Sequence, residues 1–193
     1  MSNQFSRRNF LKTGAVAIGA VAATGLLGRI DPVLGAQNPG GGPKPGEKAK
    51  VYFTRDLSAE GLRTMFARVN QPLTGKIAVK VHTGEPNGPN IIPLAWIKAL
   101  LPDVPNATVV ECNVLYDSPR KTTEGHRKTL ETNGWNFCPV DIMDAEGDVM
   151  LPIRGGKRLT EVAVGKNMAT YDSMLVLTHF KGHVQGGFGG SLK

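Results

Sequence analysis

Residues Lys76-Ile77-Ala78-Val79-Lys80-Val81 form a largely β-branched, apolar run that leads directly into His82. A short run of this kind is typical of a strand buried inside a sheet. Similar runs return at 107–112 and 173–178, and apolar residues at helical spacing lie between the runs. Strands that alternate with helices imply parallel βαβ units with right-handed crossovers. We therefore expect an α/β fold with a mostly parallel sheet and flanking helices.

Further elements are expected on either side of this central run. Helices are predicted after an N-cap at Ser58, over 91–101, and over 122–133 with Gly134 just beyond the last turn. Short strands are predicted over 50–54 and 140–143, and a β-hairpin over 150–154 and 159–164. The hairpin adds an antiparallel unit to the otherwise parallel α/β sheet.

Composition limits the class of protein. The chain has 193 residues, of which 23 are basic and 16 acidic, and its apolar content is 40%. This length and composition favour one globular domain, and two cysteines are too few for a disulfide scaffold. The apolar stretches are too short for a multi-pass membrane protein.

The first 36 residues have the layout of a secretory signal. Arg7 and Arg8 lie in the motif Ser6-Arg7-Arg8-Asn9-Phe10-Leu11-Lys12, and a mildly apolar run and Leu34-Gly35-Ala36 follow. A basic start, an apolar middle and small residues at the end are the parts of a signal peptide. The motif resembles the twin-arginine signal at every fixed position. We expect a signal peptide over 1–36; an uncleaved membrane anchor is the alternative.

This signal predicts export to the periplasm through the twin-arginine translocon, a route that carries folded proteins, often with a cofactor. Without residues 1–36 the chain keeps 19 basic and 15 acidic residues, a net charge of +4. No stripe of Lys and Arg with interleaved aromatic residues appears, so nucleic-acid binding is not expected. Residues 37–48 are rich in Pro and Gly and predict a flexible linker before a domain at 49–193.

Polar residues gather where the predicted parallel strands end, which is where α/β sheets bind ligands. Three of the four histidines lie at such ends. The candidate ligand-binding residues are Lys80, Glu85, Asp117, Arg120, Gly189, Gly190 and Lys193, and the candidate catalytic residues are His82, Lys181 and His183. Solvated loop contacts are the structural alternative for all of them.

Lysine and histidine together suit a small anionic ligand, because Lys supplies fixed charge and His exchanges a proton near neutral pH. If the site is catalytic, Lys181 would hold the anion while His82 or His183 moves a proton. Neutral imidazoles also suit a transition metal, so His179 and His183 are candidate metal ligands, although no established metal-binding spacing supports them. The glycines of 182–193 form either an anion-binding loop or a flexible end.

Cys112 and Cys138 lie 26 residues apart, outside any zinc or redox spacing. A disulfide between them is conceivable in an oxidising compartment, but two free thiols are the favoured interpretation.

Several of these segments resemble the domain of unknown function 362 family. The main match is Phe180-Lys181-Gly182-His183 followed by Gly189-Gly190-Ser191-Leu192-Lys193. The strand 77–80 and the acidic strand end at Glu111, with the helix start at Thr122-Thr123, add to it. The resemblance implies an α/β domain of unassigned chemistry.

Many members of that family carry four-iron ferredoxin clusters. Such a cluster needs about four cysteine thiolates, and this chain has only Cys112 and Cys138, so an intrinsic 4Fe–4S cluster is not expected. The family pattern also continues past Lys193, which predicts that this chain is the N-terminal part of a longer domain.

The sequence therefore predicts an exported protein that binds a small anion or a metal at the strand ends and is redox-associated by family resemblance. An accessory protein for an exported redox partner and a truncated, non-functional fragment are the alternatives. Enzymatic activity, the cofactor and the substrate stay open.

Overall fold

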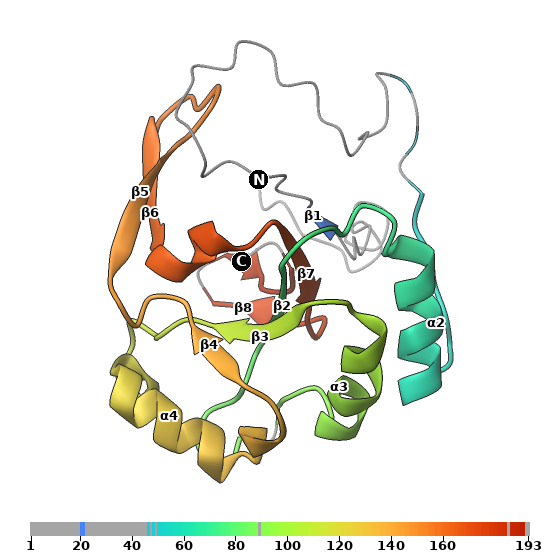
Figure 1. Ribbon diagram of the computed structural model, residues 1–193. Helices are drawn as coiled ribbons and strands as arrows, with labels where there is room; N and C mark the ends of the chain where they lie inside the picture. Colours follow the sequence, from blue (N-terminus) through green and yellow to red (C-terminus); the bar gives the residue numbers. More distant parts are fainter. Residues whose placement is uncertain are drawn as a thin grey trace, which may run out of the picture.

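The computed structural model describes residues 20–21, 46, 48, 50–88, 90–184 and 186–191 (Figure 1). Apart from Ala20–Val21, the predicted signal peptide with Arg7 and Arg8 lies outside this part of the chain. Lys193 and most of the predicted linker lie outside it as well.

A five-stranded sheet in the order β1-β7-β2-β3-β4 forms the centre of the molecule. Its strands are β1 (Ala20–Val21), β2 (Ile77–Val81), β3 (Ala107–Glu111), β4 (Val140–Ile142) and β7 (Ser173–Leu177). Strands β7, β2, β3 and β4 are parallel, and β1 pairs antiparallel with β7. The predicted α/β class with a mostly parallel sheet is thereby confirmed.

The two faces of the sheet are covered differently. Alternate residues of β2 point to opposite faces, so Ile77, Val79 and Val81 join the larger core while Ala78 joins a smaller one. Helices α2 (Ala59–Val69), α3 (Leu94–Leu100) and α4 (Thr123–Thr132) all contribute buried residues to the larger core. Figure 1 shows these helices on one side of the sheet and the hairpin of β5 (Asp148–Pro152) and β6 (Glu161–Gly165) on the other.

The ends of two helices form as their sequences predict. The Ser58 hydroxyl accepts a hydrogen bond from the Gly61 N–H at the start of α2, and Thr122 does the same for Gly125 at the start of α4. Gly134 takes a left-handed conformation with φ of 79° after α4. Helix α3 starts at Leu94 rather than at residue 91, because Pro93, with an extended backbone, precedes it.

One predicted strand is wrong. Residues 50–54 form no strand and pair with none of the described strands, and Phe53 is 84% exposed. Their β-branched and aromatic side chains favour extended backbone. A strand also needs a neighbour to share its hydrogen bonds, and propensity alone does not supply one.

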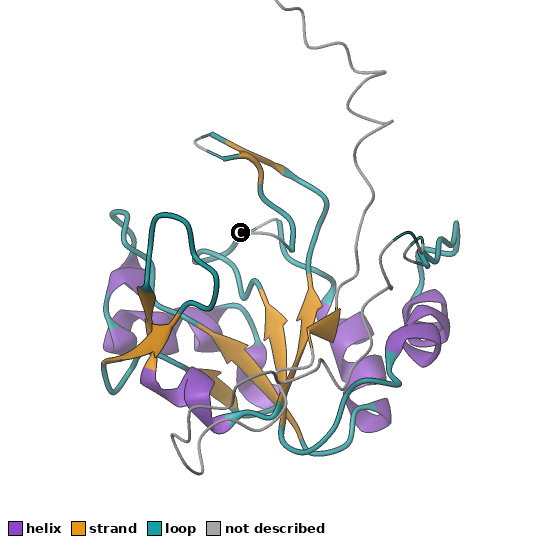
Figure 2. Ribbon diagram, turned by 90° about the horizontal axis from the view of Figure 1, so that it is seen from above, coloured by secondary structure: helices purple, strands orange, loops and turns teal. Residues whose placement is uncertain are grey.

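Two hairpins accompany the sheet. The predicted one consists of β5 (Asp148–Pro152) and β6 (Glu161–Gly165), which pair antiparallel. A second and much shorter one, β8 (Gly182–His183) with β9 (Gly187–Phe188), forms in the glycine-rich segment, where the sequence predicted only a loop. Figure 2 shows this second hairpin beyond the carboxyl ends of the sheet strands.

The strand order creates a crevice at one place in the sheet. From β2 the chain moves outward through β3 to β4, and then returns to the other side of β2 as β7. The loops that leave β2 and β7 therefore diverge, and such a switch point is where open α/β sheets bind ligands. Four short 3₁₀ helices complete the described secondary structure: η1 (Leu101–Asp103), η2 (Pro119–Lys121), η3 (Trp135–Phe137) and η4 (Lys166–Thr170). Among the described helices, none has the length and apolar character needed to cross a bilayer.

Candidate functional site: a charged pocket at the strand ends

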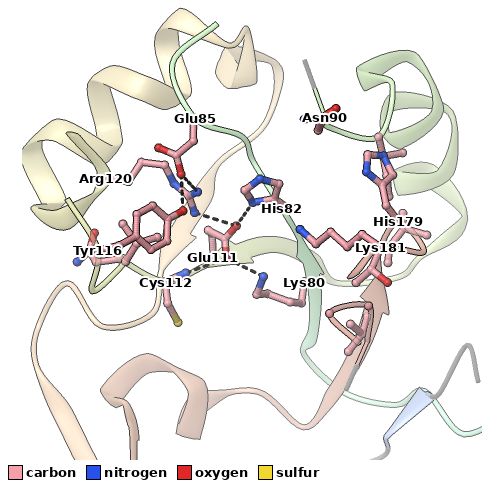
Figure 3. Close-up of a pocket in the computed structure, with 18 residues that line it drawn as sticks. Lys80, His82, Glu85, Asn90, Glu111, Cys112, Tyr116, Arg120, His179 and Lys181 are labelled. Carbon is pink, nitrogen blue, oxygen red and sulfur yellow. Dashed lines mark hydrogen bonds and ion pairs between the residues drawn. The ribbon is translucent and has the colours of Figure 1, made fainter. Parts of the chain in front are cut away.

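A pocket of about 320 Å³ opens at the carboxyl ends of β2, β3 and β7 (Figure 3). We call one side of it the carboxylate wall, which consists of Lys80, His82, Glu85, Glu111 and Arg120. The opposite side, the lysine wall, consists of His179, Lys181, Gly189 and Gly190 from the segment after β7. Asn90, Cys112 and Tyr116 also line the cavity.

Glu111 is the centre of the carboxylate wall. It is the last residue of β3, only 4% exposed, and its Oε1 lies 2.6 Å from the Lys80 ammonium. Its Oε2 lies 3.2 Å from Arg120 Nη2 and 3.7 Å from His82 Nδ1. The backbone N–H groups of Thr83 and Cys112 also donate to this carboxylate. A buried charge with this many donors is both compensated and fixed in position.

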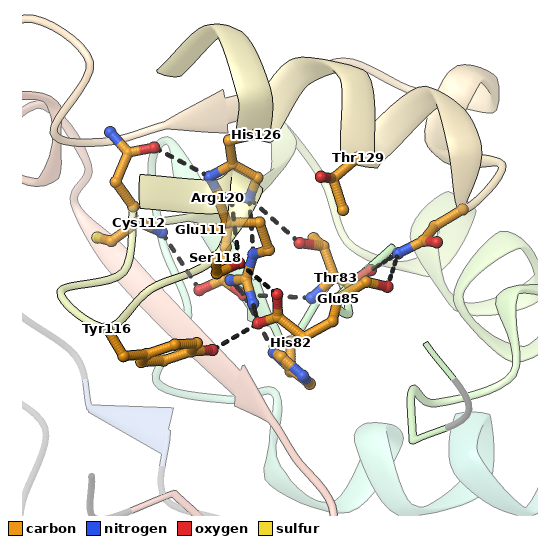
Figure 4. A network of polar contacts seen from close by, with 12 residues as sticks. His82, Thr83, Glu85, Glu111, Cys112, Tyr116, Ser118, Arg120, His126 and Thr129 are labelled. Atoms are coloured by element: carbon orange, nitrogen blue, oxygen red, sulfur yellow. Dashed lines mark hydrogen bonds and ion pairs between the residues drawn. The ribbon is translucent and has the colours of Figure 1, made fainter. Parts of the chain in front are cut away.

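Arg120 joins the two carboxylates of this wall. Its side chain is 2% exposed, and Nη1 lies 3.0 Å from Glu85 Oε1 while Nη2 faces Glu111 (Figure 4). The hydroxyls of Tyr116 and Ser118 donate to the same Glu85 carboxylate. Lys80 and Arg120 therefore balance Glu85 and Glu111, so the formal charges of this wall cancel with His82 neutral.

These contacts shift three pKa values. Burial alone would raise the pKa of Glu111, but the neighbouring His82, Lys80 and Arg120 together lower it to about 2. Burial also opposes ionisation of Glu85, whose pKa is nevertheless lowered by Ser118, Tyr116 and Arg120. Burial and the Glu85 charge raise the pKa of Tyr116 to about 12. Both carboxylates are thus ionised, and the Tyr116 phenol is neutral, at physiological pH.

His126 supports the wall from behind. It is fully buried in α4, and Arg120 Nε donates to its Nε2 at 3.4 Å while its Nδ1 lies 3.1 Å from Asn113 Oδ1. These partners assign the proton of the neutral ring to Nδ1. Burial and the Arg120 charge lower the pKa of His126 to about 4. The imidazole therefore acts as a neutral support for the guanidinium.

The loop after β2 is held against the end of α4. The Asn133 side-chain amide donates to the carbonyl oxygens of Thr83 and Glu85, and the Trp135 indole also donates to Thr83. Gly84, with φ of 92°, has no room for a side chain, since a Cβ would lie 2.6 Å from Ile91 Cγ2. This packing fixes Glu85 in front of Arg120.

The lysine wall has fewer contacts. The Gly189 N–H donates to the Lys181 carbonyl, and Thr178 and Ser191 share a hydrogen bond through their hydroxyls. Within the described part of the chain, the Lys181 ammonium forms no ion pair. Figure 3 shows Lys181 extending from this wall toward the carboxylate wall. The lysine wall therefore contributes the uncompensated charge of the pocket.

The structure brings most of the predicted site residues together. Those that line the pocket are Lys80, His82, Glu85, Arg120, His179, Lys181, Gly189 and Gly190. Asp117 is exposed and His183 accepts a hydrogen bond from the Gly186 N–H, and neither lines the pocket.

Glu111 is not among the predicted site residues, although its carboxylate has more charged and hydrogen-bonding partners than any other side chain of the pocket. Its signal was available, because it is a lone acidic residue at the end of an otherwise apolar strand. His126 was missed for a different reason. Its neighbours in the sequence are polar, so nothing indicated that its ring is buried.

Neither cysteine takes part in a disulfide, which agrees with the favoured interpretation of two free thiols. Cys112 lines the pocket, but burial and nearby carboxylates raise its pKa to about 11. A protonated thiol is a poor nucleophile and a poor metal ligand. Across the residues that the structure describes, no three His, Cys, Asp or Glu side chains are placed to share a metal ion.

The comparison with protein families identifies the class of the chain. The family described as domain of unknown function (DUF362) matches residues 77–193, which include β2, β3, β7 and every residue that lines the pocket. The chain belongs to this family. No curated protein and no solved structure matched it.

Proposed function

We propose that this protein binds a small anionic ligand in the pocket between the two walls. The observation that carries this proposal is the unequal charge of the walls. Glu85 and Glu111 are neutralised by Arg120 and Lys80, whereas Lys181 faces the cavity without an ion pair in the described part of the chain. The lining holds three cationic side chains, Lys80, Arg120 and Lys181, against two carboxylates. With its histidines neutral, the pocket therefore has one positive charge in excess.

The chemistry of the lysine wall fits an oxyanion or a carboxylate. An ammonium group supplies a point charge with three donors, and His82 and His179 add ring N–H donors when protonated. Gly189 and Gly190 bring backbone close to the cavity without a Cβ. Ionised carboxylates on the opposite wall hold the cationic groups there in place and would repel a ligand that approached them directly.

Binding of small anions to the purified full-length protein tests this proposal. Isothermal titration calorimetry with sulfate, phosphate and succinate is expected to show binding of at least one of them. Lys181→Ala is expected to weaken that binding roughly tenfold or more, because a charge-assisted contact is lost. Lys157→Ala, an exposed lysine in the loop of the β5–β6 hairpin, is the matched control. Absence of binding, or equal weakening in both variants, would contradict the proposal.

We also propose that the protein is exported by the twin-arginine pathway. The support is the motif around Arg7 and Arg8 and the small residues that end at Ala36. Replacing both arginines by lysine is expected to keep the protein in the cytoplasm, measured by cell fractionation and immunoblotting. Unchanged export of the Arg7→Lys, Arg8→Lys protein would overturn this part.

A role as an accessory protein for an exported partner is the second candidate. Leu115 is 97% exposed and lies between two residues that line the pocket, and Val184 in the β8–β9 hairpin is fully exposed. Adjoining exposed apolar side chains, such as Leu115 and the 54% exposed Tyr116, favour contact with another protein. Native mass spectrometry of the exported protein would show a stable complex in this case, and Leu115→Glu would dissociate it.

A further inference from the structure

His82 occupies a distinctive position in the pocket. It directly follows β2, and its Nδ1 lies 3.7 Å from the buried Glu111 carboxylate. Its Nε2 forms no hydrogen bond with the described residues. Figure 3 shows the ring between Glu111 and the lysine wall. One side of the ring therefore faces a fixed negative charge, and the other side is available to a ligand.

Glu111 is suited to hold an imidazolium ring in place. Its carboxylate accepts from the N–H groups of Thr83 and Cys112 and is paired with Lys80 and Arg120, so it cannot turn away. Its low pKa of about 2 keeps it ionised throughout the range in which histidine titrates. A contact of 3.7 Å is longer than a hydrogen bond, and such contacts shorten when the ring becomes charged.

We infer that His82 is the proton-accepting group of this pocket, that Glu111 positions it, and that an anion bound beside Lys181 brings a proton onto its Nε2. This inference rests on the proposed anion site. When the ligand carries no acidic proton, the proton comes from solvent. When the ligand carries an acidic O–H group, that O–H bond breaks, its electron pair stays on the ligand oxygen, and the new N–H bond forms on His82. The ligand class is thus a small oxyacid.

The other titratable groups that face His82 do not compete for this role. Those that line the same pocket are Lys80 on its own strand, Glu85 on the following loop, Glu111 on β3, Cys112, Tyr116 and Arg120 after β3, and His179 and Lys181 on the segment after β7. The carboxylates are ionised, and the pKa values of Cys112 and Tyr116 are about 11 and about 12. His179 is the remaining imidazole, and within the described residues it forms no ion pair with a carboxylate.

Proton-linked binding of sulfate tests the inference, because sulfate stays fully ionised near neutral pH. Calorimetric titrations of the full-length protein in two buffers of different ionisation enthalpy count the protons taken up. Net uptake is expected in the original protein, and in His82→Gln the uptake is expected to be lost while weaker binding remains. His183→Gln, outside the pocket lining, is the matched control and should keep the uptake.

A residue-level measurement separates His82 from the other imidazoles. At constant pH near 7, sulfate is expected to move the His82 ring resonances in the NMR spectrum toward the protonated position. In Glu111→Gln this movement should shrink while the Lys181 contact is preserved, which a merely structural histidine would not show.

Three results would overturn the inference: sulfate binding without proton uptake, unchanged uptake in His82→Gln, or uptake lost in His179→Gln instead. Absence of binding by sulfate, phosphate and succinate alike would overturn the anion site itself. The two failures are therefore distinguishable.

Discussion

The two walls of the pocket differ in how their charges are held. On the carboxylate wall, Glu111 and Arg120 are buried, and both form ion pairs with side chains from other segments of the chain. On the lysine wall, Lys181 is exposed and its ammonium has no ion pair in the part of the chain that the structure describes. The same pocket thus combines a self-neutralised scaffold with a free cation.

This difference implies that the two walls contribute to different properties of the protein, one to its folding stability and the other to ligand binding. Buried charges are strongly coupled to folding, because removing one partner leaves the other uncompensated in a medium of low dielectric constant. An exposed ammonium contributes little to folding and is available to a ligand. We therefore expect substitutions on the carboxylate wall to act mainly on the free energy of unfolding, and substitutions on the lysine wall to act mainly on affinity.

The largest effect is expected for Glu111→Ala. It leaves Lys80 and Arg120 without their shared carboxylate, and it should lower the free energy of unfolding by about 3–5 kcal/mol. Lys181→Ala is the control from the other wall and should change it by less than about 0.5 kcal/mol. Urea denaturation followed by circular dichroism measures both. Similar losses for the two variants would remove the distinction between the walls.

Gly84→Ala tests whether the loop in front of Arg120 is packed as tightly as the structure indicates. A Cβ there would collide with Ile91 and with the Asn133 amide, in addition to the strain of a positive φ. Gly147→Ala introduces the same strain, with φ of 94°, but meets no atom within 4 Å. The control should lose about 1–3 kcal/mol and Gly84→Ala clearly more. Equal losses would show that the loop has room to shift.

The pH dependence of the free energy of unfolding should also come from the carboxylate wall and from His126, which lies behind it. The pKa of His126 is about 4 in the folded protein against 6.5 ordinarily, so the unfolded chain binds more protons between these values. Stability should therefore fall as the pH falls from 6.5 to 4. Glu111, with a folded pKa of about 2 against 4.5, should cause a further loss from 4.5 downward.

His126→Gln isolates the first of these windows. Its free energy of unfolding, measured in urea at several pH values, should depend less on pH between 6.5 and 4 than that of the original protein. An unchanged slope would mean that other groups carry the effect.

The smallest effect is expected for Tyr116→Phe. The substitution removes one of the hydroxyl donors to the half-exposed Glu85 carboxylate, which keeps Ser118 and Arg120. A loss of about 0.5–1.5 kcal/mol follows for a single hydrogen bond. A much larger loss in thermal or urea unfolding would show that the phenol is essential to the wall.

Much of the fold follows from the sequence, because the apolar runs at β2, β3 and β7 are continuous. The helix starts at Ser58 and Thr122 are also recognisable, since Ser and Thr are favoured N-cap residues. The strand at 50–54 was wrong because propensity carries no information about an available neighbour. The β8–β9 hairpin was missed because its glycines show no alternation of apolar and polar residues.

The site was predictable only in part. Residues at or shortly after a strand end, such as His82 and Lys181, are visible from the strand pattern, and Arg120 is visible from its place in the loop that follows β3. The partners of those residues are not visible, because the pairing of Arg120 with Glu85 and Glu111 depends on how the loop after β2 and the segment after β3 meet in space. The position of His183 outside the lining likewise depends on the hairpin, whose reversal turns the chain after Lys181.

A crystal structure of the protein with selenate, a sulfate analogue that is located by its anomalous scattering, would show where the anion binds. We expect selenate in the pocket, in contact with the Lys181 ammonium and on the side of His82 that faces away from Glu111. Selenate bound only elsewhere on the molecule, with an empty pocket at concentrations that saturate binding in solution, would contradict it.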